Sequence, residues 1–70
     1  MTFQPNQMVQ FIKQFQVLEG HELGAIIEVG MPAAIIEPYR NKLNILVPQR
    51  YWVMTLAGPA AVPESYLEAT

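Results

Sequence analysis

The chain has no cysteine and no aspartate, and it has a single histidine, His21, among its 70 residues. Without cysteine it can form neither a disulfide nor a thiolate site, which fits a reducing compartment. A zinc site usually takes three or four histidine or cysteine ligands, and one histidine cannot supply them. We therefore expect no metal site and no cofactor.

Charged residues are also scarce, at 14% of the chain against about 25% in an average protein. Six glutamates outnumber four cations and give a formal net charge of −2; the cations are Lys13, Arg40, Lys42 and Arg50. Nucleic-acid binders usually present a broad basic face. Because so few cations can make few phosphate contacts, we do not expect a nucleic-acid partner.

Long apolar runs are missing. No stretch of the sequence approaches the roughly 18 consecutive apolar residues that span a bilayer. The first residues lack the charged start and apolar centre of a signal peptide. We expect a cytoplasmic protein without a membrane partner.

Catalytic motifs are missing as well. The sequence His21-Glu22-Leu23-Gly24-Ala25 begins like a zincin helix, but Ala25 stands where the second histidine must be. Ser65 lacks the elbow motif of a hydrolase nucleophile, and no glycine-rich phosphate loop occurs. We expect no catalytic residue within the chain.

Apolar side chains, in contrast, are in excess, at 51% of the residues. A domain of this size buries only about 60% of the surface that its unfolded chain exposes. Apolar surface should therefore remain exposed, and a large exposed apolar patch usually marks an interface. We expect a homo-oligomer or docking on a larger protein; the alternative is a monomer with an ordinary surface, since over half of any protein surface is apolar.

Proline and glycine recur at short intervals, which favours short strands over helices. Residues 1–70 are long enough for one domain, which we expect to be all-β. Five or six short antiparallel strands should form a meander, with a short 3-10 turn near residues 63–66. The expected strands are 8–13, 23–29, 33–37, 43–47 and 51–56, and residues 57–62 are expected to form a loop.

Residues 7–18 fit two patterns. A helix would align Met8, Phe11, Ile12, Phe15 and Leu18, whereas a strand would place Val9, Phe11, Phe15 and Val17 on one face. We prefer the strand, because a lone helix would need a sheet face to cover.

Alternation along the expected strands assigns the core. In residues 43–47, for example, Leu43, Ile45 and Val47 share one side of the strand. The side chains expected to be mostly buried are Val9, Phe11, Ile27, Ile35, Ile45 and Val47.

Both ends of the chain resemble an SH3-like small β-barrel. Residues 3–12 are similar to the opening of many bacterial members, with Asn6 where these have glycine, and asparagine tolerates the left-handed backbone. Residues 62–67 are similar to the Pro-x-x-Tyr close of SH3 domains, and residues 24–27 resemble the second strand. The resemblance implies an SH3-like barrel. The acidic loop and the Ala-Leu-Tyr-Asp-Tyr run of peptide-binding members are missing, so it does not extend to polyproline binding.

Aromatic residues and proline in the C-terminal half are the candidate partner-binding set: Tyr51, Trp52, Pro63 and Tyr66. Tyrosine and tryptophan often anchor interfaces, although a single tryptophan on an alternating strand can also fill the core. We expect a non-enzymatic protein-interaction or self-assembly module. The alternative is a small enzyme or ligand binder whose site forms only in a homo-oligomer.

Overall fold

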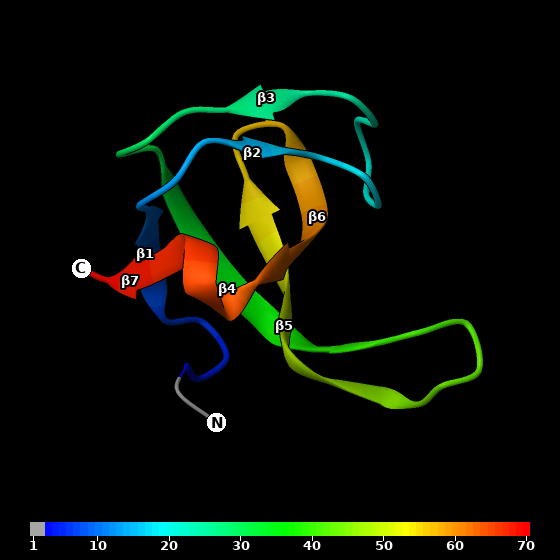
Figure 1. The fold of residues 1–70 in the computed structure, drawn as a ribbon. Coiled ribbons are helices and arrows are strands. Elements are labelled where there is room, and N and C mark those ends of the chain that lie inside the picture. The colour runs from blue at the N-terminus through cyan, green and yellow to red at the C-terminus, as the bar shows by residue number, and fades with distance from the viewer. Residues whose placement is uncertain (1–2) are drawn as a thin grey trace.

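The computed structural model describes residues 3–70, which form seven β-strands and one 3-10 turn, η1 (Figure 1). The all-β class and the 3-10 turn near the C-terminus are confirmed. Within residues 3–70, no helix has the length and apolar character needed to cross a bilayer. The elements are β1 Met8–Phe11, β2 Phe15–Gln16, β3 Ile26–Ile27, β4 Pro32–Arg40, β5 Leu46–Thr55, β6 Gly58–Pro63, η1 Glu64–Tyr66 and β7 Leu67–Ala69.

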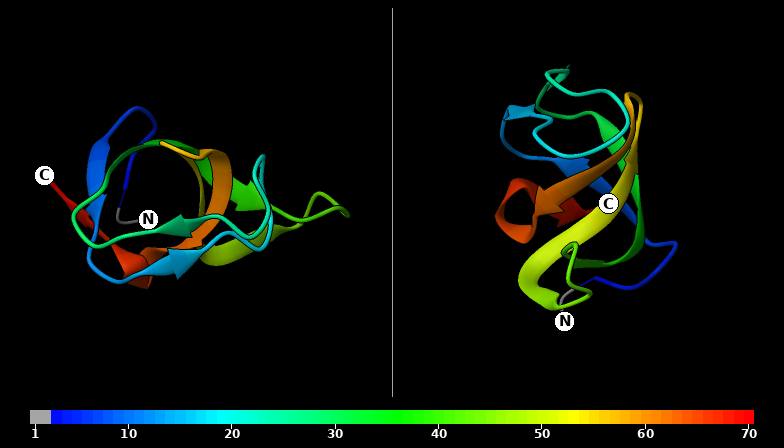
Figure 2. Two further views of the ribbon diagram at one scale, coloured as in Figure 1. Left: turned by 90° about the horizontal axis from the view of Figure 1, so that it is seen from above. Right: turned by 90° about the vertical axis from the view of Figure 1, so that its right-hand side faces the viewer.

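The strands form two antiparallel sheets, a large one in the order β6-β5-β4-β1-β7 and a small one of β2 and β3. In the large sheet β4, β5 and β6 are a meander, whereas β1 pairs with the distant β7 through Val9 and Ala69. The β2–β3 hairpin lies in front of the large sheet (Figures 1 and 2). Over residues 3–70, neither sheet is closed by strand pairing. The fold is therefore established as a small all-β domain with a five-stranded antiparallel sheet, and the SH3-like barrel stays a prediction.

The core lies between the two sheets. Phe15 and Ile27 from the small sheet are buried together with Val9, Ile35 and Val53 from the large one. Strand alternation explains which of these residues are buried, because every second residue of β1 and of the start of β4 points inward. The expected burial of Val9, Phe11, Ile27 and Ile35 is confirmed.

The expected burial of Ile45 is wrong, since the residue is 56% exposed, and Val47 is only half-buried. Of the strand expected at 43–47 only Leu46 and Val47 are formed, and they belong to the same strand, β5, as most of the residues expected at 51–56. Pro48 does not end this strand, because it lies at an irregularity where the β4–β5 register shifts. Proline is tolerated at such places, where the ladder does not need its N–H.

The loop expected at residues 57–62 is wrong. Most of these residues form the strand β6, which pairs with β5 from Gly58 to Pro63. The small residues of β6 let the segment before β3 approach its free edge. Gly20 bridges Ala60, and a Cβ atom at position 20 would lie 2.4 Å from the carbonyl oxygen of Pro59. Close backbone packing, rather than β-propensity, makes this segment a strand.

Near the N-terminus, residues 7–18 contain the strands β1 and β2, separated by a bend at residues 12–13, so the strand interpretation is correct and the helix is not formed. The strands are shorter than expected: β1 ends at Phe11, and only Ile26 and Ile27 of residues 23–29 pair as a strand. Asn6 has a φ of 67°, the left-handed conformation that the resemblance implied for this position.

Candidate functional site

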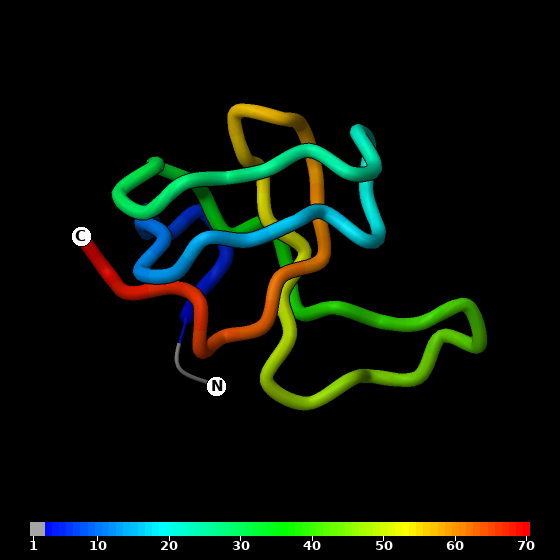
Figure 3. The backbone as a smooth tube through the Cα atoms, turned by 45° about the horizontal axis from the view of Figure 1, so that its top comes forward, coloured from blue at the N-terminus to red at the C-terminus, as the bar shows by residue number. Residues whose placement is uncertain are grey.

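The most prominent surface feature is a hairpin, residues 40–50, which we call the arm. It comprises the ends of β4 and β5 and their connection, and it projects away from the rest of the fold (Figures 1 and 3). Leu43, Ile45 and Leu46 at its tip are 78%, 56% and 44% exposed. None of the three side chains belongs to the core, and exposed apolar patches often occur at interaction sites.

The tip of the arm is held in one conformation by its own hydrogen bonds. The Asn41 side-chain oxygen accepts hydrogen bonds from the backbone N–H groups of Leu43, at 2.9 Å, and Ile45, at 3.1 Å. The backbone N–H of Asn44 donates to the Asn41 carbonyl at 2.9 Å, and Asn44 has the left-handed φ of 62°. The guanidinium of Arg40 donates to the Asn44 carbonyl at 3.1 Å. Asparagine is well suited to such turns, because it tolerates this φ and caps its own backbone.

The arm is also strongly basic. It contains Arg40, Lys42 and Arg50, which are three of the four cations of the chain, and none of the six glutamates. The rest of the chain has one lysine and all six glutamates, a formal balance of −5 against +3 on the arm. The molecule is therefore divided into a basic arm and an acidic body.

A groove of about 350 Å³ runs along one side of the arm from its base, and we call it the arm groove. Tyr39 and Trp52 lie at its base, with ring centroids 5.9 Å apart. Glu37 is the register partner of Trp52 and lies at the same end, whereas Lys42 lines the end towards the tip. The groove therefore has an acidic, aromatic end and a basic end.

Glu19 joins the acidic end from the segment before β3. Its carboxylate accepts a hydrogen bond from the Tyr39 hydroxyl. This hydrogen bond is the main reason why the pKa of Tyr39 lies above its usual value of 10.0, and desolvation and the Glu19 charge act in the same direction. Arg50 opposes the shift weakly. The pair fixes Glu19 against the base of the arm.

The structure separates the four residues of the candidate partner-binding set. Tyr51 belongs to the core, with 2% of its surface exposed, and its hydroxyl accepts a hydrogen bond from the backbone N–H of Phe3. Trp52, the next residue of β5, points to the opposite face of the sheet and reaches the arm groove. Tyr66 is half-buried and packs edge-on against Phe15, with ring centroids 5.2 Å apart.

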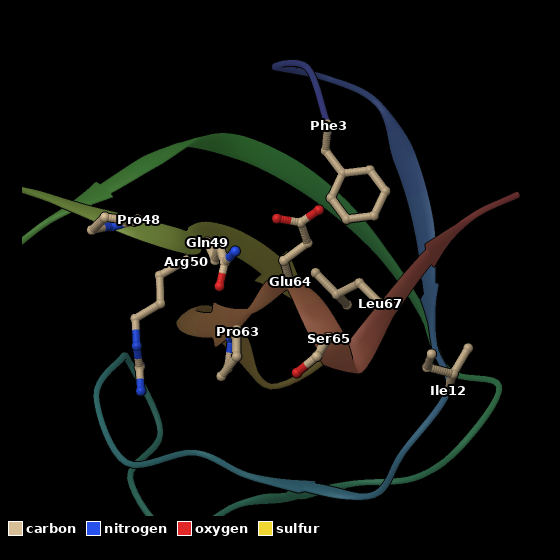
Figure 4. A pocket seen from close by; sticks show the side chains of 9 residues that line it. All are labelled: Phe3, Ile12, Pro48, Gln49, Arg50, Pro63, Glu64, Ser65 and Leu67. Atoms are coloured by element: carbon tan, nitrogen blue, oxygen red, sulfur yellow. The ribbon is translucent and has the colours of Figure 1, made fainter. Parts of the chain in front are cut away.

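Pro63 lines a second, larger cavity of about 560 Å³ near η1 (Figure 4). The side chain of Glu64 extends towards Phe3 across this cavity, and Arg50 points away from Phe3. Ser65 also lines it. Tyr51 therefore lies inside, Trp52 lines one cavity and Pro63 another, so the set does not form one continuous surface. Partner binding by these residues stays a prediction.

His21 lies far along the sheet from Ser65. Its backbone N–H donates to the carbonyl of Pro59 at 2.8 Å, near the start of β6, whereas Ser65 lies in η1, beyond the end of β6. The length of β6, about 15–20 Å at the rise of a strand, separates the two side chains.

The sequence pointed to Trp52 and, as an alternative surface, to the hairpin of residues 39–42, but not to Glu19 and Glu37, which line the same groove. Three of the four cations fall between positions 40 and 50 without an acid among them, which indicates the basic hairpin but neither of these glutamates. The meeting of Glu19 with the arm base depends on pairing between distant segments, which no local pattern encodes. Comparisons with protein-family models, with curated proteins and with solved structures found no match.

Proposed function

We propose that the protein is a non-enzymatic self-assembly module and that the arm is its contact element. One observation carries the proposal: a hairpin held by its own hydrogen bonds projects from the fold with large apolar side chains exposed at its tip. Because the tip is already ordered, it loses little conformational entropy when a partner covers it.

The apolar tip can supply substantial binding energy. Burying a leucine or isoleucine side chain fully is favourable by about 1.5–3 kcal/mol. Three such side chains, Leu43, Ile45 and Leu46, are exposed here. Association costs several kcal/mol in lost freedom of motion, so the tip alone supports a weak complex, and the neighbouring groove must add to it.

We further infer an SH3-like small barrel as the scaffold that presents the arm. The strand order β6-β5-β4-β1-β7, with η1 between β6 and β7, supports this inference. So does the bridge between Gly20 and Ala60, which brings the β2–β3 region to the free edge of β6. In this scaffold the arm is the connection between two central strands.

The test is sedimentation velocity across a range of protein concentrations. We expect the wild type to associate and the double variant Leu43→Ser/Ile45→Ser to be monomeric at the same concentrations. Leu56→Ser is the matched control, because Leu56 is 72% exposed at the β5–β6 turn, away from the arm. It should associate like the wild type.

Circular dichroism shows whether each variant is folded. A wild type that remains monomeric at every concentration contradicts self-assembly. A folded Leu43→Ser/Ile45→Ser variant that associates as strongly as the wild type shows that another surface makes the contact.

A further inference from the structure

Resting on the proposed function, we propose that two copies dock about a twofold axis with their arms antiparallel. In this arrangement the acidic end of each arm groove meets the basic end of the other, and Glu37 of one copy faces Lys42 of the second. The partner is thus a second copy of this chain, and the groove is the binding site.

The first step of the argument is the separation of charge along the groove. Glu19 and Glu37 lie at its base beside Trp52, whereas Arg40, whose guanidinium bonds the Asn44 carbonyl, and Lys42 line it towards the tip. Glu37 and Arg40 at the end of β4 are about 10 Å apart along the strand, and Lys42 lies further on, in the turn. These separations exceed the screening length of about 8 Å at physiological ionic strength. The two ends therefore do little to neutralise each other within one chain.

The hydrogen bonds of the turn keep the two ends of the groove apart. The Asn41 side chain and the Asn44 backbone fix the turn, and Arg40 is engaged with the Asn44 carbonyl. The opposite charges of the groove therefore remain available, in fixed positions, to a second molecule.

The second step concerns orientation. Side-by-side arms that run parallel would place glutamate against glutamate and lysine against lysine, which opposes association. Antiparallel arms place opposite charges together at both ends. A twofold axis generates such pairs twice, because in an isologous interface residue i contacts residue j and residue j contacts residue i. The apolar tip of each arm then lies near the half-exposed Trp52 of the other copy, which supplies an apolar contact.

The third step concerns the kind of partner. A phosphate-bearing surface, such as a nucleic acid or an anionic membrane, would be attracted by Arg40 and Lys42 but repelled by Glu19 and Glu37, which line the same groove. The body outside the arm carries a formal −5, which adds to the repulsion. The groove is matched better by a surface that carries both signs of charge in the reverse order. The arm groove of a second, antiparallel copy is such a surface.

Two single charge reversals test the pairing. In Glu37→Lys, both twofold-related contacts become lysine against lysine, and in Lys42→Glu both become glutamate against glutamate. We expect each variant alone to dissociate about tenfold more readily than the wild type. A mixture of the two is different, because the mixed dimer has one wild-type contact and one reversed but still opposite-charge contact. The mixture should associate within about threefold of the wild type.

The control variants change charge by the same amount elsewhere. Glu22→Lys lies in the exposed turn before β3, and Lys13→Glu changes the one cation outside the arm. Both should associate within about twofold of the wild type. Sedimentation velocity on fluorescently labelled Glu37→Lys, with unlabelled Lys42→Glu added, reports the mixed dimer directly. Circular dichroism confirms that every variant is folded.

The outcomes separate this inference from the proposed function. If the single reversals associate like the wild type while Leu43→Ser/Ile45→Ser does not, the arm is the contact but the antiparallel pairing is wrong. If the reversals dissociate and their mixture fails to associate, Glu37 and Lys42 do not face each other, and the pairing is again wrong. Both proposals would be overturned if the wild type does not self-associate but co-sediments with vesicles of phosphatidylserine and phosphatidylcholine.

Discussion

Ile35 and Ile45 lie ten positions apart and differ in how far they are buried. Ile35 on β4 has 1% of its surface exposed and touches the core, whereas Ile45 near the tip of the arm is 56% exposed. We expect Ile35→Ala to lower the free energy of unfolding by about 2–5 kcal/mol, because it leaves a cavity. Ile45→Ala should change it by less than about 0.5 kcal/mol. Urea unfolding at low protein concentration, where association is minimal, measures both.

If Ile45→Ala is as destabilising as Ile35→Ala, then the arm packs against the body in the monomer, and its tip is not a free surface.

Tyr39 and Glu19 form the second residue-scale prediction. The hydrogen bond to the Glu19 carboxylate raises the pKa of Tyr39 above 10.0, so Glu19→Gln should lower the Tyr39 pKa towards that value. Because the folded state binds this proton more tightly than the unfolded state, the contribution to stability is fully present below pH 10. It is lost as the pH rises through the Tyr39 pKa of the folded protein.

The measurement is a titration of the tyrosine 13Cζ resonances by NMR, with Tyr39→Phe used to assign Tyr39. A Tyr39 pKa that is the same in wild type and Glu19→Gln would show that Glu19 does not hold the hydroxyl proton.

At the scale of the element, β4 and β6 differ in how far the sequence predicts them. Residues 33–37 include two adjacent isoleucines and follow a turn at Gly30, so the start of β4 could be predicted from local pattern. The residues of β6 are Gly-Pro-Ala-Ala-Val-Pro, which local propensity assigns to a loop. They form a strand because β5 pairs with them on one side and Gly20 approaches on the other, and both contacts are distant in sequence.

The same contrast applies to the candidate site. Trp52 could be named from its residue type alone. Its neighbour Tyr51 lies in the core, because alternate residues of a strand face opposite sides and only the folded chain shows which side is buried. Glu19 and Glu37 have no local feature that distinguishes them from the other glutamates. Only the folded chain brings them to one end of the groove.

Gly20 provides a test of the contact that positions β6. An alanine Cβ there would lie 2.4 Å from the Pro59 carbonyl oxygen and 2.8 Å from the Ala60 Cα, both of them backbone atoms that cannot turn aside. We expect Gly20→Ala to lower the free energy of unfolding by about 3 kcal/mol, because the two segments must move apart. Gly24→Ala is the control: its Cβ meets nothing within 4 Å, although its φ of 83° still disfavours alanine by about 1–2 kcal/mol.

Thermal unfolding followed by circular dichroism compares the two variants. If Gly20→Ala unfolds at the same temperature as Gly24→Ala, the edge of β6 is not held by this segment in solution.

At the scale of the whole molecule, the body and the arm are separable. The core residues all lie outside residues 40–50, so replacing residues 40–49 by an Asn-Gly turn, which suits a two-residue hairpin, should leave a folded domain. The wild type should unfold at a temperature that rises with protein concentration, because association stabilises the folded state by mass action. The variant with the short turn should unfold at a temperature independent of concentration.

Differential scanning calorimetry at several protein concentrations distinguishes the two chains. A short-turn variant that no longer folds would mean that the arm stabilises the body. A wild type whose unfolding temperature does not vary with concentration would be inconsistent with reversible self-association.

The pairing of β1 with β7 has a consequence for how fast the domain forms. Val9 and Ala69 are 60 positions apart, and closing so long a loop costs entropy before the contact is made. The local hairpins β4–β5 and β5–β6 need no such closure and can form within about 1–10 μs. The large sheet is complete only when β7 reaches β1, so we expect this step to limit the rate, with folding in the millisecond-to-second range of non-local β topologies. Until then the edge of β1 that β7 will cover is open, and the unfinished chain is at its most vulnerable to wrong strand pairing.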